Sequence, residues 1–205
     1  MKHVIFILSL FLSTQIFATE IKNVVKDVEI KKYQGQWFEI ARITNIFQKL
    51  CAKNVTAQYS EDANSDMVVV KNICETKKGR TIAVNGRARV NPKHTDINGA
   101  LQVTFAGFKN RWLFESPFDQ TKSIAGDYWV LGLGTSKDYG YSIVGDANSK
   151  YGWILSRQAT LDKKTLKEIA VVLKKNNYRT DEFIMTAQDG SPVQPGTTLE
   201  EHLGK

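Results

Sequence analysis

The sequence predicts an all-β domain, an antiparallel barrel of eight strands followed by one helix. Short segments with alternating apolar and polar side chains recur between polar turns, which is the pattern of half-buried strands. Near the C-terminal end the period changes to that of a helix. The chain has 205 residues, 42% of them hydrophobic, which suits one domain with a sizeable core. Eight such strands close into a barrel that is filled by side chains or holds one small ligand.

The N-terminus has the pattern of a secretory signal, and residues 1–18 are interpreted as a cleaved signal peptide. Residues 1–3 are short and basic, and an apolar run over residues 4–17 ends before Ala18, the expected last residue of the signal. The apolar run is too short to span a membrane as a helix. We therefore expect an exported protein whose folded domain begins at residue 19.

The first strand follows Gly35, which interrupts a polar lead-in. An alternating, aromatic-rich run predicts this strand from about residue 36 to residue 43. If Trp37 points into the barrel, Glu39 shares its face. An inward carboxylate needs a partner, so Glu39 would make a structural hydrogen bond near the barrel floor, or else would face a ligand or act in catalysis.

Two motifs at the ends of the barrel resemble those of the lipocalin family. Gly35-Gln36-Trp37 resembles the Gly-x-Trp signature of the first lipocalin strand, and the run that ends in Arg157 resembles the last-strand motif. The residues around the first motif are very similar to the bacterial outer-membrane lipocalins and to the apolipoprotein D branch. The alternative is an unrelated β-domain with a buried tryptophan.

The resemblance implies an eight-stranded antiparallel up-and-down barrel over residues 19–188, with the C-terminal helix packed outside. It implies that Arg157 lies across the Trp37 ring and, together with Gly35, forms the barrel floor. A guanidinium in that position covers apolar surface and keeps its donors for backbone carbonyls.

The resemblance also implies a function and a location. An exported lipocalin would bind and carry or store a hydrophobic ligand, a fatty acid or a lysophospholipid, in the cell envelope. Many bacterial members have a lipidated cysteine directly after the signal, whereas the first cysteine here is Cys51. We therefore expect a protein without a lipid anchor, in the periplasm, peripheral to the outer membrane or secreted. Dimers are known in the family, so a homodimer remains open.

In lipocalins the connection after the first strand folds over the barrel mouth, so residues 42–50 are expected to form a lid. Its apolar residues Ile46, Phe47 and Leu50 would pack onto a ligand or the rim, or simply against the barrel.

Two cysteines in an exported chain suggest one disulfide. Strands are expected on both sides of the polar turn at residues 61–65. If Tyr59 faces Asp66, antiparallel counting places Cys51 opposite Cys74, and a bridge there would stabilise the domain by roughly 3 kcal/mol. The alternative is two free thiols, one of them catalytic.

The remaining barrel strands are expected at residues 55–59, 67–70, 81–90, 101–105, 127–133, 139–144 and 151–158. Their inward residues are mostly apolar or small, which favours a ligand cavity, while a barrel filled by its own side chains is the alternative. Tyr128 is a candidate donor to a ligand headgroup at the mouth. The predicted ligand-binding residues are Val55, Ala57, Val84, Ala88, Val103, Phe105, Tyr128 and Trp153.

After Thr160, apolar residues at helical spacing predict one helix of about three turns with lysines on the opposite face. A short strand at residues 183–186 follows. Residues 189–205 are polar and contain proline and glycine, so they are predicted to be a flexible tail.

Composition and motifs narrow the classes of function. The formal net charge is +7, spread along the chain, which indicates a solvated surface or weak attraction to anionic membrane headgroups. No nucleic-acid motif is present, and the histidines have no metal-ligand spacing. We therefore expect no enzyme, metal or cofactor. Two alternatives stay open: an interaction module on a filled barrel, and an enzyme that uses Glu39 or a free Cys51 or Cys74.

Overall fold

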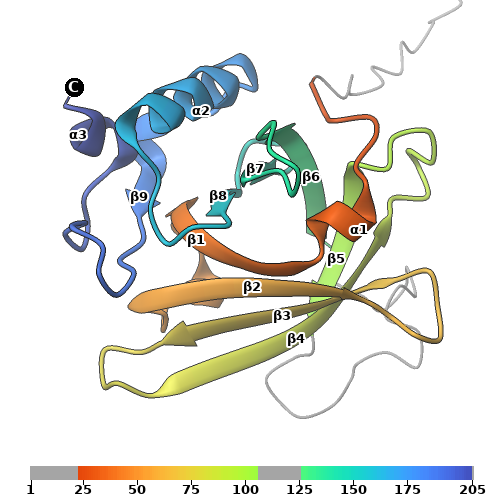
Figure 1. Cartoon of the computed structure of the whole chain (residues 1–205), viewed down its shortest axis with the longest axis horizontal. Coiled ribbons are helices and arrows are strands. Elements are labelled where there is room, and N and C mark those ends of the chain that lie inside the picture. The colour runs from red at the N-terminus through yellow and green to blue at the C-terminus, as the bar shows by residue number, and fades with distance from the viewer. Residues whose placement is uncertain (1–22, 106–125, 205) are drawn as a thin grey trace, which may run out of the picture.

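The computed structural model describes residues 23–105 and 126–204 and shows a closed antiparallel barrel (Figure 1). Its strands are β1 Gly35–Ile43, β2 Lys53–Glu61, β3 Val68–Glu75, β4 Thr81–Val90, β5 Ala100–Phe105, β6 Gly126–Leu133, β7 Tyr141–Gly145, β8 Gly152–Ser156 and β9 Phe183–Met185. Strands β2 to β8 follow in chain order, and β1 closes the ring by pairing with both β8 and β2. The ninth strand, β9, pairs with β1. The predicted eight-stranded up-and-down barrel is confirmed.

Short helices flank the barrel, and one longer helix packs on its outer surface (Figure 1). The helices are α1 Ile30–Tyr33, η1 Ile46–Gln48, α2 Lys163–Lys175, η2 Thr180–Glu182 and α3 Leu199–Leu203. The carboxylate of Asp162 accepts a hydrogen bond from the backbone N–H of Thr165 at 2.8 Å and so caps the first turn of α2. The predicted helix and its position outside the barrel are confirmed.

Alternation along the strands separates two apolar cores. On β8, Leu155 points into the barrel toward Trp37, whereas the neighbouring Ile154 points outward toward Leu166 of α2. The core inside the barrel is formed by Val28, Tyr33, Trp37, Ala57, Tyr59, Val70, Ala88, Leu101, Val130, Val144 and Leu155. The outer core lies between the barrel wall, α2 and α3. It includes Ile40, Ala41, Leu131, Ile143, Ile154, Leu166, Ile169, Leu173, Phe183 and Leu199.

The strand β1 changes its partner halfway along its length. Residues 35–38 pair with β2, whereas residues 41–43 pair with β9. Beyond the β1–β2 pairing, the side-chain amide of Gln188 donates to the carbonyl oxygens of Glu39 at 2.8 Å and Val55 at 2.9 Å. The C-terminal segment thus completes the wall between β1 and β2.

The pairing of β2 with β3 differs from the predicted register. Tyr59 faces Val70 and not Asp66, and β3 is longer than predicted. A bulge between Lys53 and Thr56 shifts the ladder, and Cys51 lies before β2 begins. Cys51 therefore reaches Cys74 from the loop before β2, so the predicted pair of cysteines is correct although the register used to count it is wrong.

The C-terminal residues correct the prediction of a flexible tail at 189–205. The helix α3 begins with a capping box made by Thr198 and Glu201. Its Leu199 is completely buried in the outer core, and Leu203 is 8% exposed. The polar composition concealed these two anchoring leucines. The signal predicted at residues 1–18 lies outside the described residues.

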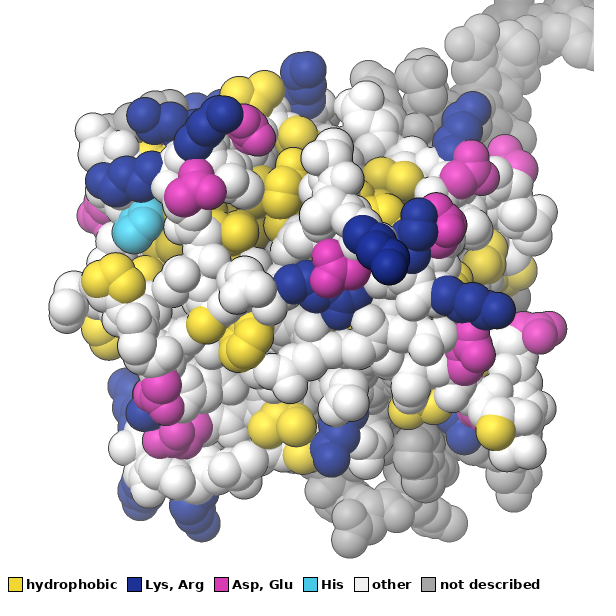
Figure 2. Space-filling model, viewed as in Figure 1, with side chains coloured by type: hydrophobic (Ala, Val, Ile, Leu, Met, Phe, Trp, Pro, Cys, Tyr) yellow, Lys and Arg dark blue, Asp and Glu magenta, His cyan; other side chains and the backbone are white. Residues whose placement is uncertain are grey.

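Basic side chains are scattered over the surface, as the sequence suggests. On the face in Figure 2, Lys and Arg side chains lie singly or in small groups among acidic and neutral ones. Within residues 23–105 and 126–204, no helix combines the length and apolar character needed to cross a bilayer.

Candidate functional site

One end of the barrel is closed by the predicted floor residues. The Arg157 guanidinium lies 3.8 Å from the centre of the Trp37 ring. It donates to the carbonyl oxygens of Lys32 at 2.6 Å, Gln36 at 2.9 Å and Asp138 at 3.2 Å. Gly35 has a φ of +90°, and a Cβ there would lie 3.5 Å from an Arg157 nitrogen, so glycine suits this turn. The guanidinium thus ties three chain segments across the floor.

Above the floor, four hydroxyl groups meet inside the barrel. The Tyr33 hydroxyl lies 2.9 Å from that of Tyr128 and 2.8 Å from Ser142 Oγ, and the Tyr128 hydroxyl lies 2.8 Å from that of Tyr59. Burial raises the pKa of Tyr33 to about 12 and raises the pKa values of Tyr59 and Tyr128 above their ordinary value. These phenols stay protonated at neutral pH. We call these four residues the hydroxyl cluster.

A small cavity adjoins the hydroxyl cluster at the closed end. Its volume is about 20 Å³, enough for roughly one water molecule. It is lined by Val28, Ile30, Tyr33, Gln34, Tyr59, Val68, Val70, Ala88, Leu101, Tyr128 and Val130. The closed half of the barrel is therefore nearly filled by its own side chains.

The half of the barrel near the mouth is more open. Phe105 points inward, since it pairs with Gly86 on the same face as the buried Ala88, yet it is 38% exposed. Val84, Val103 and Trp153 are also inward-facing and only partly buried. Apolar side chains that point into a closed barrel but still contact solvent form a surface that a hydrophobic ligand can cover.

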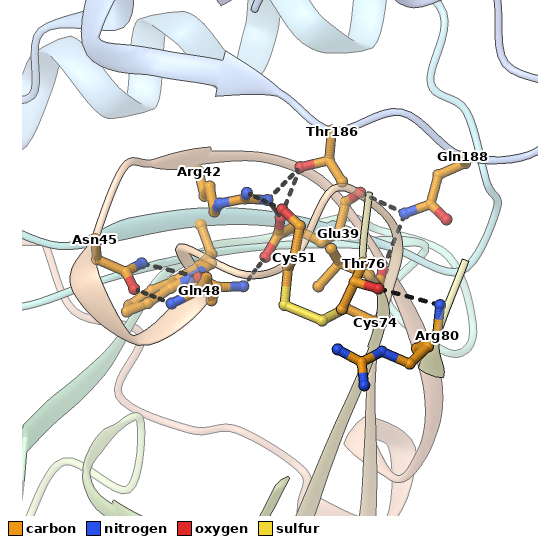
Figure 3. The surroundings of a disulfide bond; sticks show 12 residues. Glu39, Arg42, Asn45, Gln48, Cys51, Cys74, Thr76, Arg80, Thr186 and Gln188 are labelled. Atoms are coloured by element: carbon orange, nitrogen blue, oxygen red, sulfur yellow. Dashed lines mark hydrogen bonds and ion pairs between the residues drawn. A yellow bond between two sulfur atoms is a disulfide. The ribbon is translucent and has the colours of Figure 1, made fainter. Parts of the chain in front are cut away.

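A buried polar network lies on the mouth side of Trp37. Glu39 is 2% exposed and forms an ion pair with Arg42 (Figure 3). Its oxygens also accept hydrogen bonds from Gln48 Nε2 and Thr186 Oγ1, both at 2.6 Å. Glu39 therefore has a structural partner set, as expected for a buried carboxylate, but near the lid and not near the floor. It lies two residues beyond Trp37 along β1, toward the mouth.

The lid at residues 42–50 is fastened to the barrel by Gln48. Gln48 Oε1 accepts from Trp153 Nε1 at 2.9 Å and from Asn45 Nδ2 at 2.8 Å. Directly after the lid, Cys51 forms a disulfide with Cys74 of β3, with a Cα–Cα distance of 5.5 Å (Figure 3). The predicted bridge is confirmed, and the alternative of two free thiols is wrong.

The apolar lid residues do not pack as expected. Ile46 is 77% exposed and Leu50 is 61% exposed, so neither contacts the rim closely. The turn η1 directs Gln48 toward the barrel and leaves Ile46 outside. The side chain of Phe47 lies outside the described residues. Polar side chains thus hold the lid down, and two apolar side chains lie exposed on its surface beside the exposed Thr44 and Lys49.

The predicted ligand-binding residues divide between the buried interior of the barrel and its open half near the mouth. Val55, Ala57 and Ala88 are buried inside the barrel. Val84, Val103, Phe105 and Trp153 lie on the open half. Tyr128 does not reach the mouth, because its hydroxyl is taken up by the hydroxyl cluster.

Sequence reasoning missed several interior residues. Tyr33 lies in the polar stretch before Gly35 and yet belongs to the inner core, and Gln34 beside it lines the cavity. Alternation does put Tyr59 on the face of Val55 and Ala57, which was the available signal. No sequence pattern identifies Gln48, because its contact with Trp153 depends on the conformation of the turn η1. Among the described residues, no three metal-ligating side chains cluster.

Comparison with known proteins agrees with the geometry. Residues 28–188 match the family described as a lipocalin-like domain. The chain is 28% identical over 184 residues to temperature-induced lipocalin-1 of Arabidopsis thaliana, covering 89% of this chain and 91% of that protein. It is 29% identical over 169 residues to the outer membrane lipoprotein Blc of Escherichia coli K12, covering 82% and 84%. It is 27% identical over 175 residues to apolipoprotein D of Macaca fascicularis, covering 82% of each. The chain therefore belongs to the lipocalin family, which binds small hydrophobic ligands.

Proposed function

We propose that this lipocalin, once exported, binds and carries or stores a fatty acid or lysophospholipid in the cell envelope, without a lipid anchor of its own. The observation that carries the proposal is the open half of the barrel, where Phe105, Val84, Val103 and Trp153 face inward and remain accessible. The similarity to a protein named an outer membrane lipoprotein supports the cell envelope as the location.

The mechanism of binding is passive burial. Each CH₂ group removed from water contributes about 0.8 kcal/mol, so a long acyl chain outweighs the cost of its own ordering. Because side chains nearly fill the closed half of the barrel, the acyl chain of the ligand would lie in the open half, under the lid. Release of Gln48 from Trp153 and Glu39 would open the lid for exchange, while the disulfide keeps its far end in place.

Tryptophan fluorescence tests the proposal directly. Titration of the delipidated protein with palmitic acid and with lysophosphatidylcholine should give a saturable change in emission, because Trp153 lies on the open half. The Trp153→Phe variant should lose most of that change. Trp129 lies in the outer core, so Trp129→Phe is the matched control and should keep it. No saturation with any acyl ligand would reject the proposal.

A second candidate function is that of a membrane-surface module on a filled barrel. The small interior cavity, the exposed Ile46 and Leu50 and the net charge of +7 favour it. The Ile46→Ser/Leu50→Ser variant should then release the protein from anionic vesicles. Val171, 53% exposed on α2, offers the matched control Val171→Ser. Vesicle binding without any acyl-ligand signal would select this second function.

A further inference from the structure

A hollow lies on the outer side of the barrel floor, next to the Arg157 contact. Its volume is about 500 Å³, which is within the range of small-molecule sites, roughly 300–1,000 Å³. Helix α1, the turn between β6 and β7 and the end of β8 bring its wall together. The lining residues are Lys31, Lys32, Gln34, Lys137, Asp138 and Arg157. It shares only Gln34 with the small cavity inside the barrel.

The hollow carries an excess of positive charge. Four of its six lining residues are cations, and Asp138 is the one acid among them. Lys32 also forms an ion pair with Glu29 at 2.5 Å, so two positive charges remain when both acids are counted. Lys31 and Lys137 are exposed and form no ion pair with any residue of the described ranges. These two ammonium groups are therefore available to an anion.

The two segments that carry these lysines are already held in place. Arg157 donates to the carbonyl oxygens of Lys32 in α1 and of Asp138 in the turn after β6. The backbone N–H of Glu29 also donates to the Tyr139 hydroxyl at 2.9 Å. Three of the five guanidinium N–H groups make bonds to carbonyl oxygens, so two remain for another acceptor. A preorganised site loses less free energy to ordering when its ligand binds.

We propose that this hollow is a binding site for a dianionic phosphate group, separate from the acyl site inside the barrel. A phosphomonoester carries about −1.5 to −2 charges at pH 7, which matches the two positive charges of the hollow better than a carboxylate does. Guanidinium and ammonium groups are also the side chains that most often bind phosphate in proteins. The phosphate comes from inorganic phosphate in solution or from the headgroup of a lipid.

A lipid headgroup in the hollow would set the orientation of the protein on a membrane. The floor and the lid lie at opposite ends of β1, which runs from Gly35 at the floor to Ile43 before the lid. Docking through the floor would therefore face the barrel mouth away from the bilayer. Docking through the exposed Ile46 and Leu50 would face it toward the bilayer.

An NMR titration of the mature protein with inorganic phosphate tests the site. At constant ionic strength, phosphate should cause saturable shifts of the amide resonances of residues 30–34 and 136–139. The Lys31→Gln/Lys137→Gln variant should bind phosphate roughly fivefold more weakly or worse, because two charged donors are lost. Neither lysine makes an ion pair in the part of the chain that the structure describes, so we expect this variant to fold normally.

The matched control is Lys77→Gln/Lys78→Gln. These lysines are exposed in the turn between β3 and β4, and their replacement changes the net charge by the same amount. The control should keep the phosphate affinity of the wild-type protein. Equal weakening in the two variants would show a general effect of net charge and would overturn the site, as would the absence of saturable shifts beside the hollow.

Vesicles distinguish the two sources of phosphate. Phosphatidic acid presents a phosphomonoester and phosphatidylglycerol a phosphodiester, so the two are compared by co-sedimentation at equal surface charge. A preference for phosphatidic acid that is lost in Lys31→Gln/Lys137→Gln, but kept in Ile46→Ser/Leu50→Ser, would support the site and identify a lipid source. Saturable phosphate binding without vesicle binding would support the site with free phosphate as its ligand. The acyl-ligand fluorescence signal should be the same in the lysine variants, so the proposed function is tested independently.

Discussion

Arg157 makes a contact that a lysine cannot reproduce. Its planar fork stacks on Trp37 and reaches the carbonyl oxygens of Lys32, Gln36 and Asp138 together. An ammonium is a point donor with stronger hydration, so Arg157→Lys should lower the free energy of unfolding by about 2 kcal/mol. Urea denaturation measures this loss.

The matched control is Arg179→Lys. Arg179 is 70% exposed and pairs with acidic side chains on the surface, so its replacement should change stability by less than about 0.5 kcal/mol. Equal losses in the two variants would show that the floor contact contributes nothing special.

Glu39 is the second residue whose replacement should be costly. Glu39→Ala would leave Arg42 without its counter-charge and Gln48 and Thr186 without an acceptor. We expect a loss of about 3 kcal/mol or more, since a broken buried pair leaves an uncompensated charge. Chemical denaturation tests this against Glu182→Ala, which removes an exposed partner of Arg179. A Glu39→Ala protein as stable as this control would contradict the account.

Among single residues, the sequence allowed the floor contact to be predicted but not the hydrogen bonds that hold the lid to the barrel. Trp37 and Arg157 stand in motifs that fix their positions. Gln48 belongs to no such motif. Its amide holds the lid only because the backbone turn places it between the Trp153 donor and the Glu39 acceptor. Tyr128 was assigned to the mouth because its phase on β6 was not fixed from the sequence.

The disulfide between Cys51 and Cys74 fixes the C-terminal end of the lid to strand β3. Replacement of Cys51 and Cys74 by alanine should lower the free energy of unfolding by about 3 kcal/mol, because the unfolded chain loses a loop constraint. The same variant should exchange ligand faster, since the C-terminal end of the lid then loses its covalent anchor. Thermal melts and stopped-flow mixing measure the two effects. Treatment of the wild-type protein with a reductant should reproduce both, whereas the alanine variant should not respond.

Element positions were predictable where alternation is regular. β4 has the predicted bounds, and α2 has the predicted apolar face. β3 was predicted too short because a continuous apolar run has no period to count. α3 was missed because two leucines in a polar segment give no pattern, and their burial depends on a core made by distant residues.

The hydroxyl cluster should show itself in the alkaline titration of the whole molecule. Buried tyrosines have pKa values above the ordinary value of about 10, and that of Tyr33 is raised to about 12. A raised pKa means that the stabilisation is complete below the unfolded value and is lost as the pH rises toward the folded value. The free energy of unfolding should therefore begin to fall near pH 10 and continue to fall through about pH 12.

Phenolate absorbance measures this effect. In the native protein at about pH 11, part of the seven tyrosines should remain un-ionised, and addition of urea should release them. If all seven ionise together in the native state, the cluster is not as buried as described.

The overall architecture followed from the sequence because alternating strands, a floor motif and a late helix all agree on one barrel. The division of its interior into a filled half and an open half did not follow. That division depends on how Tyr33 and α1 enter the barrel from the lead-in, and on side-chain packing across strands that lie far apart in the chain.

Strand β1 pairs with strands near the C-terminus, and this affects how the protein folds during its synthesis. β1 is among the first strands synthesised, yet it pairs with β8 and β9 near the other end of the chain. Pairings of such long range fold slowly. A chain that is synthesised from its N-terminus cannot complete the barrel wall until nearly all of its residues have left the ribosome. Any early stop in translation would release a product with an unpaired strand edge, which invites aggregation.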